Sequence, residues 1–111
     1  MAGREWQRGP KPNNGLRVSL SARADLREIW NYIEEGSGSS TVADRFMDSL
    51  RDRFRLLSEW PLIGRARNDL RTGLRTSAVG DYLIFYRLEN SDVVIQRVLH
   101  GRRNLPALFR R

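Results

Sequence analysis

The side chains best suited to chemistry in this sequence are one histidine and a set of arginines in the second half of the chain. His100 is the only histidine, and imidazole is the side chain that exchanges protons most readily near neutral pH. Guanidinium groups bind phosphates and carboxylates in a bidentate manner. The four arginines that we assign to such binding are Arg75, Arg97, Arg102 and Arg103. We expect them to line up with His100 on one exposed surface that binds the target.

His100 itself has two interpretations. It could act as an acid–base residue, but such catalysis needs a base, an acid and cations within hydrogen-bond reach of one another. Alternatively it ends the last strand of the fold, with its ring fixed by a backbone carbonyl and with Gly101 allowing the chain to turn.

Composition excludes several other kinds of site. The chain has no cysteine, so it has neither a disulfide framework nor a thiolate zinc site. One histidine and scattered carboxylates have no metal-ligand spacing, and neither a phosphate-binding glycine loop nor a nucleophile elbow is present. We therefore expect no metal and no cofactor. No apolar run approaches the roughly 20 residues that span a bilayer, and no signal peptide is recognisable, so we expect a cytoplasmic protein without a membrane partner.

Charge is segregated along the chain. The net charge is +7, yet residues 21–60 carry six arginines against eight acids, whereas residues 61–111 carry ten against four. This distribution predicts a basic second half that meets a phosphate-bearing or acidic partner. Lys11 is the only lysine; the preference for arginine suits bidentate contacts, but a GC-rich genome would produce it too.

The first half of the chain predicts a leader, a strand and a helical hairpin. Residues 1–15 are rich in Gly, Pro and Asn and are expected to form a flexible leader, followed by one domain over residues 16–111. Alternation over residues 16–20 predicts a strand. Helical spacing then predicts one helix capped by Ser21 and ending near Glu35, and a second helix that begins with a Thr41–Asp44 capping box and ends before Pro61. Four aromatic side chains of these helices are assigned to the core: Trp30, Phe46, Phe54 and Trp60.

The second half predicts a three-stranded meander. A loop over residues 62–72 leads to a strand at 74–79, a turn, a strongly apolar central strand at 82–88, and a last strand at 93–99 in which Gln96 and Arg97 interrupt the alternation. Short connections imply antiparallel pairing. The order β-α-α-β-β-β predicts an α+β fold in which a helical hairpin packs on one curved antiparallel sheet.

Five segments carry a resemblance to a known family. They are DLREIWNYI at residues 25–33, ADRF at 43–46, PLIGR at 61–65, GDYLIFYR at 80–87 and RVLHGRR at 97–103. In this order and spacing they resemble the ParE branch of the RelE/ParE toxin superfamily, over residues 16 to about 106. Each fragment alone is common, and the specificity comes from the five together.

The resemblance implies a toxin of a type II toxin–antitoxin module that poisons DNA gyrase. Charge segregation and the lack of a complete acid–base set favour action by binding, without bond-making chemistry of its own. It also implies a cognate antitoxin of the ParD kind or a related one, which covers the sheet edge and the helical groove in a hetero-oligomer. That antitoxin should be both acidic and apolar. The residues assigned to its contacts are Trp30, Ile33, Phe46, Leu50 and Arg87.

Two alternatives stay open. In the ribonuclease branch of the superfamily, which cuts messenger RNA on the ribosome, basic residues on the middle strands and a C-terminal Tyr or His are implied to be catalytic. Here Leu83 follows Tyr82, and Phe109 stands where a catalytic tyrosine is expected, so His100 is the catalytic candidate only in that case. The other alternative is an antitoxin-binding domain that is no longer toxic.

Overall fold

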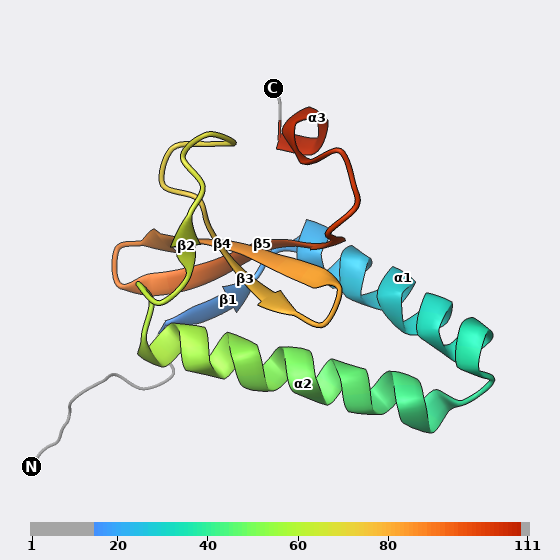
Figure 1. Cartoon of the computed structure of the whole chain (residues 1–111). Helices are drawn as coiled ribbons and strands as arrows, with labels where there is room; N and C mark the ends of the chain where they lie inside the picture. The colour runs from blue at the N-terminus through green and yellow to red at the C-terminus, as the bar shows by residue number, and fades with distance from the viewer. Residues whose placement is uncertain (1–14, 110–111) are drawn as a thin grey trace, which may run out of the picture.

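Two long helices cover one face of a five-stranded sheet, and a short C-terminal helix covers the other (Figure 1). The computed structural model describes residues 15–109, and the predicted α+β order of elements is confirmed. The elements are β1 (Leu16–Val18), α1 (Leu20–Ser37), α2 (Ser40–Glu59), β2 (Arg65–Ala66), β3 (Arg75–Val79), β4 (Tyr82–Glu89), β5 (Asp92–His100) and α3 (Leu105–Phe109).

The sheet has the order β1-β5-β4-β3-β2. Its centre is the predicted antiparallel meander of β3, β4 and β5. The sheet as a whole is mixed rather than antiparallel throughout, because β1 pairs with β5 in parallel. Parallel neighbours need a long crossover connection, and here the rest of the chain supplies it. A rule based on short connections could not foresee this pairing.

The first helix begins earlier than predicted. The Ser19 hydroxyl accepts a hydrogen bond from the Ala22 N–H at 3.0 Å, and the Ser19 N–H donates to the Ile95 carbonyl at 2.9 Å. Ser19 is therefore both the N-cap of α1 and its link to β5. The predictions that Ser21 caps the helix and that the strand continues to Leu20 are wrong; Leu20 lies in the first turn and is 84% exposed.

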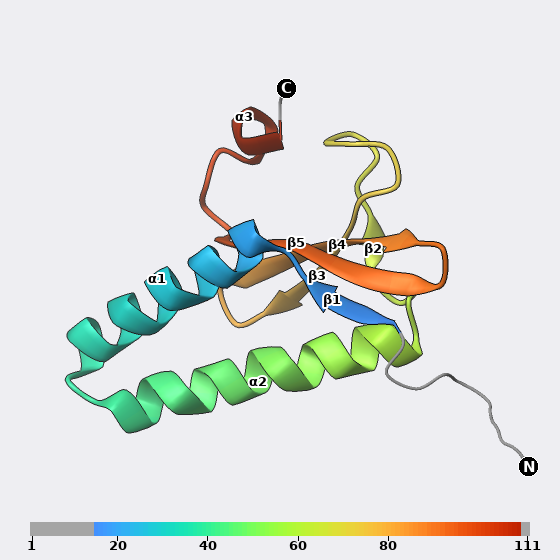
Figure 2. The same cartoon turned by 180° about the vertical axis from the view of Figure 1, so that it is seen from behind.

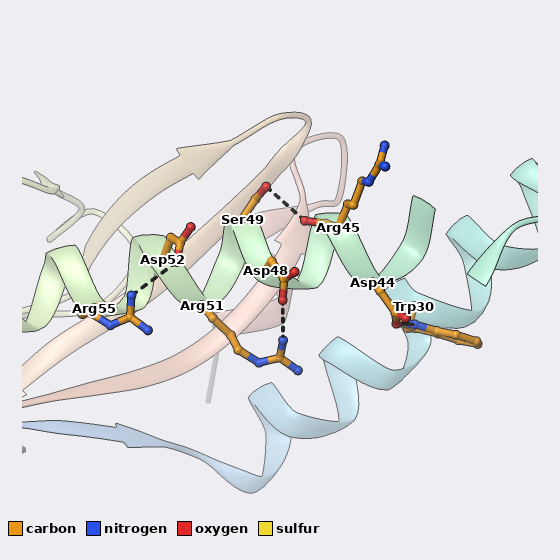
Figure 3. Close-up of polar contacts among 8 residues, drawn as sticks. All are labelled: Trp30, Asp44, Arg45, Asp48, Ser49, Arg51, Asp52 and Arg55. Atoms are coloured by element: carbon orange, nitrogen blue, oxygen red, sulfur yellow. Dashed lines mark hydrogen bonds and ion pairs between the residues drawn. The ribbon is translucent and has the colours of Figure 1, made fainter. Parts of the chain in front are cut away.

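The second helix also has a different cap. Ser39, not the Thr41–Asp44 pair, precedes α2, and its hydroxyl accepts from the Val42 N–H at 3.2 Å. Asp44 instead accepts a hydrogen bond from the Trp30 indole N–H at 2.8 Å, which ties the two helices together (Figure 3). Asp44, predicted to be part of a capping box, thus links the two helices instead.

The main core lies between the helical hairpin and the sheet, as the helical spacing predicts. Trp30 and Phe46 are half-buried at its margin and Phe54 is buried, but the assignment of Trp60 to the core is wrong, since 62% of it is exposed beyond the end of α2. The fully buried members include Leu50, Leu57, Ile84, Tyr86, Val93, Ile95 and Val98.

A second core on the opposite face of the sheet was not predicted. Phe109 of α3 packs on Phe85 of β4, with ring centroids 4.9 Å apart. Leu74 and Leu99 complete this buried cluster. Strand β4 reads as apolar on both sides because helices cover both its faces (Figure 2). The segment predicted as a loop also contains the short strand β2, which pairs with β3.

The interruption predicted at Gln96 and Arg97 is confirmed as a bulge. Phe85 pairs with Arg97 and Tyr86 pairs with Ile95, so Gln96 is the extra residue of β5. The predicted leader, residues 1–15, lies outside the described residues apart from Gly15. Within residues 15–109, neither long helix is apolar enough to cross a bilayer.

Candidate functional site

Arg97 joins β5 to the first helix. Its guanidinium donates to both carboxylate oxygens of Asp25, at 2.8 and 2.9 Å, and the Val98 N–H donates to the same carboxylate at 2.9 Å. The hydrogen bonds to Asp25 raise the pKa of Arg97 above its ordinary value. Side-chain exposure is 28% for Arg97 and 9% for Asp25. This arginine fixes α1 on the sheet and has little freedom to bind a target.

Arg75 is committed to the fold as well. It lies on the helix-facing side of β3, opposite Tyr86, and its guanidinium donates to the Gly64 carbonyl at 2.7 Å and to the Leu62 carbonyl at 3.1 Å. The Tyr86 hydroxyl donates to the Pro61 carbonyl and accepts from the Gly64 N–H. Together these bonds hold the chain as it leaves α2.

The four predicted target-binding arginines therefore do not share one surface. Arg75 and Arg97 project from opposite faces of the sheet, because Arg75 pairs with the helix-facing Tyr86 whereas Arg97 pairs with Phe85 of the second core. Arg102 and Arg103 are exposed in the turn after β5. The expectation of a single exposed arginine surface is wrong, because backbone carbonyls and one buried carboxylate occupy two of the four guanidinium groups.

His100 ends β5, and its ring is fixed by the backbone, though by an amide rather than the predicted carbonyl. The Arg102 N–H donates to Nδ1 at 3.1 Å, so the neutral ring carries its proton on Nε2. The ring also meets Tyr82 edge to face, with centroids 5.2 Å apart. His100 can thus donate a hydrogen bond from Nε2, whereas Nδ1 is already occupied by the Arg102 N–H.

The positions expected to be catalytic in a ribonuclease belong to the second core. Leu83 packs against that core, and Phe109 is buried in it. Arg71 donates to the Phe109 carbonyl and lies 5.5 Å from the ring centroid. This face of the sheet is therefore covered by α3 at the place where an acid–base set would have to meet RNA.

A cavity of about 300 Å³ opens between α1 and the ends of β4 and β5. Burial raises the pKa of Tyr82, and the neighbouring Tyr32 and Asp81 add to the shift. Of the predicted target-binding residues, His100 and Arg103 line this cavity. The lining comprises Asp25, Glu28, Ile29, Tyr32, Tyr82, Val98, Leu99, His100 and Arg103.

A second cavity, of about 320 Å³, forms a groove between the two long helices. Its apolar floor is bordered by the charged row of α2, where Arg51 pairs with Asp48 at 3.0 Å and Arg55 with Asp52 at 3.3 Å (Figure 3). We call this cavity the helical groove. Its lining residues are Leu26, Arg27, Trp30, Asp44, Met47, Leu50, Arg51 and Phe54.

The predicted antitoxin contacts fall into separate places. Trp30 and Leu50 line the helical groove. Ile33 and Phe46 pack at the edge of the main core, and Phe46 contacts Tyr82 with ring centroids 5.5 Å apart. Arg87 lies on β4, where it pairs with Glu89 at 3.4 Å.

The sequence reasoning missed Arg27 and Arg51 of the groove. Arg27 lies three residues before Trp30, and Arg51 lies four after Met47, spacings that place basic side chains beside the apolar stripes. A search for cations at the stripe margins would have found them. Among residues 15–109, no three side chains of the metal-ligating types gather at one point.

Comparison with known proteins identifies the family. The family model described as "ParE toxin of type II toxin-antitoxin system, parDE" matches residues 16–105. Toxin ParE3 of Caulobacter vibrioides is 42% identical over 83 residues, which cover 75% of this chain and 82% of that protein. Toxin ParE1 of the same organism is 37% identical and covers 82% and 93%. Toxin ParE1 of Mycobacterium tuberculosis is 31% identical and covers 77% and 87%.

Solved structures agree with the fold. The chromosomal ParDE system of P. aeruginosa matches with a TM-score of 0.69 at 19% identity, over 78% of this chain and 94% of that one. The toxin–antitoxin complex RelBE2 of Mycobacterium tuberculosis matches with a TM-score of 0.57 at 25% identity, over 78% and 95%. The matched region spans every strand and both long helices described above, and the chain therefore belongs to the family of ParE toxins of type II toxin–antitoxin systems.

Proposed function

We propose that this ParE toxin acts in the cytoplasm on DNA gyrase, holding the enzyme in the state in which DNA is cleaved, and that a cognate ParD-like antitoxin neutralises it. Membership of the ParE family carries the proposal. The hydrogen bond of His100 favours the gyrase proposal over the ribonuclease alternative, because Nδ1 already accepts the Arg102 N–H and is not free to act as a base. Of the four predicted target-binding arginines, Arg102 and Arg103 are the exposed ones, and we assign them to the target contact.

Purified toxin incubated with gyrase, ATP and supercoiled plasmid should cause cleaved plasmid to accumulate, and it should leave messenger RNA intact on translating ribosomes. Replacing both Arg102 and Arg103 by glutamate should weaken gyrase poisoning at least tenfold, because a reversed charge at an interface is strongly unfavourable. Arg55→Glu, a single charge reversal near the far end of α2, should leave poisoning unchanged. Cleavage of messenger RNA without any effect on gyrase would reject the proposal.

His100→Ala separates the two branches in cells. A binding toxin should keep arresting growth and inducing the DNA-damage response, whereas a ribonuclease would lose its activity with the fold intact. Expression that causes no growth arrest, even of the unaltered chain, would point to a toxin that has lost its activity.

We infer that the antitoxin occupies the helical groove. The groove offers an apolar floor with Arg27 and Arg51 at its margin, which suits a segment that alternates apolar and acidic side chains. Two solved relatives are named as ParDE and RelBE2 toxin–antitoxin systems. The names of these relatives support an antitoxin as the class of partner. The side chains of the groove indicate that the bound segment is apolar and acidic.

Arg27→Glu combined with Arg51→Glu should weaken antitoxin binding by tenfold or more and reduce its dependence on salt, because both charges oppose an acidic segment. Isothermal titration at 50 and 300 mM salt measures both effects. Arg55→Glu makes the same charge change as Arg51→Glu alone, one turn further along α2 and outside the groove, and should bind normally. Equal affinities for the double variant and this control would show that the antitoxin binds elsewhere.

A further inference from the structure

The cavity beside His100 contains polar groups that the fold does not use. Asp25 is engaged with Arg97 and Val98, and Nδ1 of His100 is engaged with Arg102. Residues 15–109 offer no side-chain hydrogen bond or ion pair to Glu28, Tyr32 or Tyr82, all three of which line the cavity. An acceptor and several donors therefore face the same open space.

The hydrogen-bonding groups that line the cavity indicate the kind of ligand that would fit it. Glu28 of α1 contributes a carboxylate to the lining, and His100 and Arg103 contribute donors from the end of β5, because the neutral His100 ring carries its proton on Nε2. Apolar side chains, including Ile29, also line the cavity, and Tyr32, another lining residue, is 69% exposed. A matching ligand has donors on one edge, acceptors on another and a flat face that packs on a phenol ring.

We propose that this cavity binds the guanine base of a nucleotide. Guanine carries its N1–H and N2–H₂ donors on one edge, suited to Glu28, and its O6 and N7 acceptors on another, suited to Arg103 and His100. Tyr32 supplies a stacking surface. At about 300 Å³ the cavity is at the lower end of the range for small-molecule sites, which fits one base.

Adenine does not satisfy the same groups. It places an acceptor, N1, where guanine has the N1–H donor, so the Glu28 carboxylate would face a lone pair instead of a hydrogen. Discrimination between the two purines is therefore the property that distinguishes this site from a general aromatic surface.

The test is titration of the full chain with GMP and with AMP, followed by amide chemical shifts in NMR spectra. GMP should bind at least tenfold more tightly than AMP and should shift the amides of α1 and of the end of β5. Glu28→Gln should weaken GMP binding tenfold or more and remove the preference over AMP, because a charge-assisted pair of hydrogen bonds is lost. Tyr32→Leu should weaken both nucleotides about tenfold by removing the stacking surface.

Glu35→Gln is the matched control, with the same charge change on an exposed residue of α1 outside the cavity. It should bind GMP as the unaltered chain does. Equal binding of GMP and AMP, or unchanged GMP binding by Glu28→Gln, would overturn the proposal. Thermal melting of each variant shows that a loss of binding is not a loss of fold.

Two short single-stranded DNAs distinguish a free nucleotide from a nucleic acid as the source of the base. A thymine pentamer with one central guanine should bind more tightly than GMP, and more weakly as salt rises, if the site serves nucleic acid; equal affinity identifies the free nucleotide. The same pentamer with a central adenine should bind more weakly in either case, and the loss of this difference counts against the guanine site. A chain that binds GMP but leaves gyrase unaffected would reject only the proposed function.

Discussion

Asp25→Ala should lower the free energy of unfolding by about 2–4 kcal/mol, since removing one member of a buried ion pair leaves the other uncompensated. The substitution removes both hydrogen bonds from Arg97 and the acceptor of the Val98 N–H. Because Arg97 keeps some contact with water, at 28% side-chain exposure, we expect less than the full loss seen for a completely buried pair. Urea unfolding followed by circular dichroism measures the change.

Asp25→Asn is the informative companion to this variant. Its carbonyl oxygen can still accept the Val98 N–H, but it carries no charge for Arg97, so its stability should lie between those of the unaltered chain and Asp25→Ala. Glu28→Ala, one turn along the same helix, should change the free energy by less than about 1 kcal/mol, as is usual for an exposed position. If Asp25→Ala unfolds at the same urea concentration as Glu28→Ala, the pair does not hold α1 on the sheet.

Gly64→Ala should destabilise the protein by about 2–4 kcal/mol, through overpacking together with weakened hydrogen bonds. A methyl group at this position would lie 2.7 Å from Cε1 and 2.8 Å from Cζ of Tyr86, and closer still to the Tyr86 hydroxyl oxygen. Tyr86 is fully buried, so its ring has nowhere to move. The displaced backbone would also strain the bonds that Gly64 forms with Tyr86 and Arg75.

A double-mutant cycle with Tyr86→Phe identifies the cause. Tyr86→Phe removes the hydroxyl and its bonds to Pro61 and Gly64, and should cost about 1–2 kcal/mol by itself. Because the closest contact is then gone, the double variant should be more stable than the sum of the two single effects predicts. Strict additivity would show that the constraint on Gly64 does not come from the Tyr86 hydroxyl. Gly36→Ala, where a methyl group meets nothing within 4 Å, is the matched control.

The elements that sequence reasoning found are those whose pattern is local. Helical spacing through Ile29 and Phe54, and the apolar run through Ile84, fixed the nature of α1, α2 and β4 without knowledge of their partners. Both caps were misplaced by two residues, because more than one serine or threonine near each helix start can act as the cap. The choice of Ser19 depends on its bond to Ile95, far away in the chain.

The site was harder to predict because it depends on contacts between distant residues. A run of arginines indicates a basic surface, but no local pattern shows that Arg97 pairs with Asp25, 72 positions away, or that Arg75 binds carbonyls at the end of α2. Phe109 illustrates the same limit, since the sequence shows only that a phenylalanine stands where a catalytic tyrosine is expected. Its role as the anchor of α3 on Phe85 appears only when the second face of the sheet is seen.

The parallel pairing of β1 with β5 affects how the toxin is made. On the ribosome, the amino-terminal strand emerges first but finds its neighbour only when residues 93–95 have left the exit tunnel. The ion pair between Asp25 and Arg97 likewise cannot form until Arg97 of β5 has emerged. Such distant pairings slow folding, so β1 stays unpaired on the nascent chain until β5 is available. Translation that stops before residue 93 therefore releases a fragment in which β1 has no neighbour in the sheet.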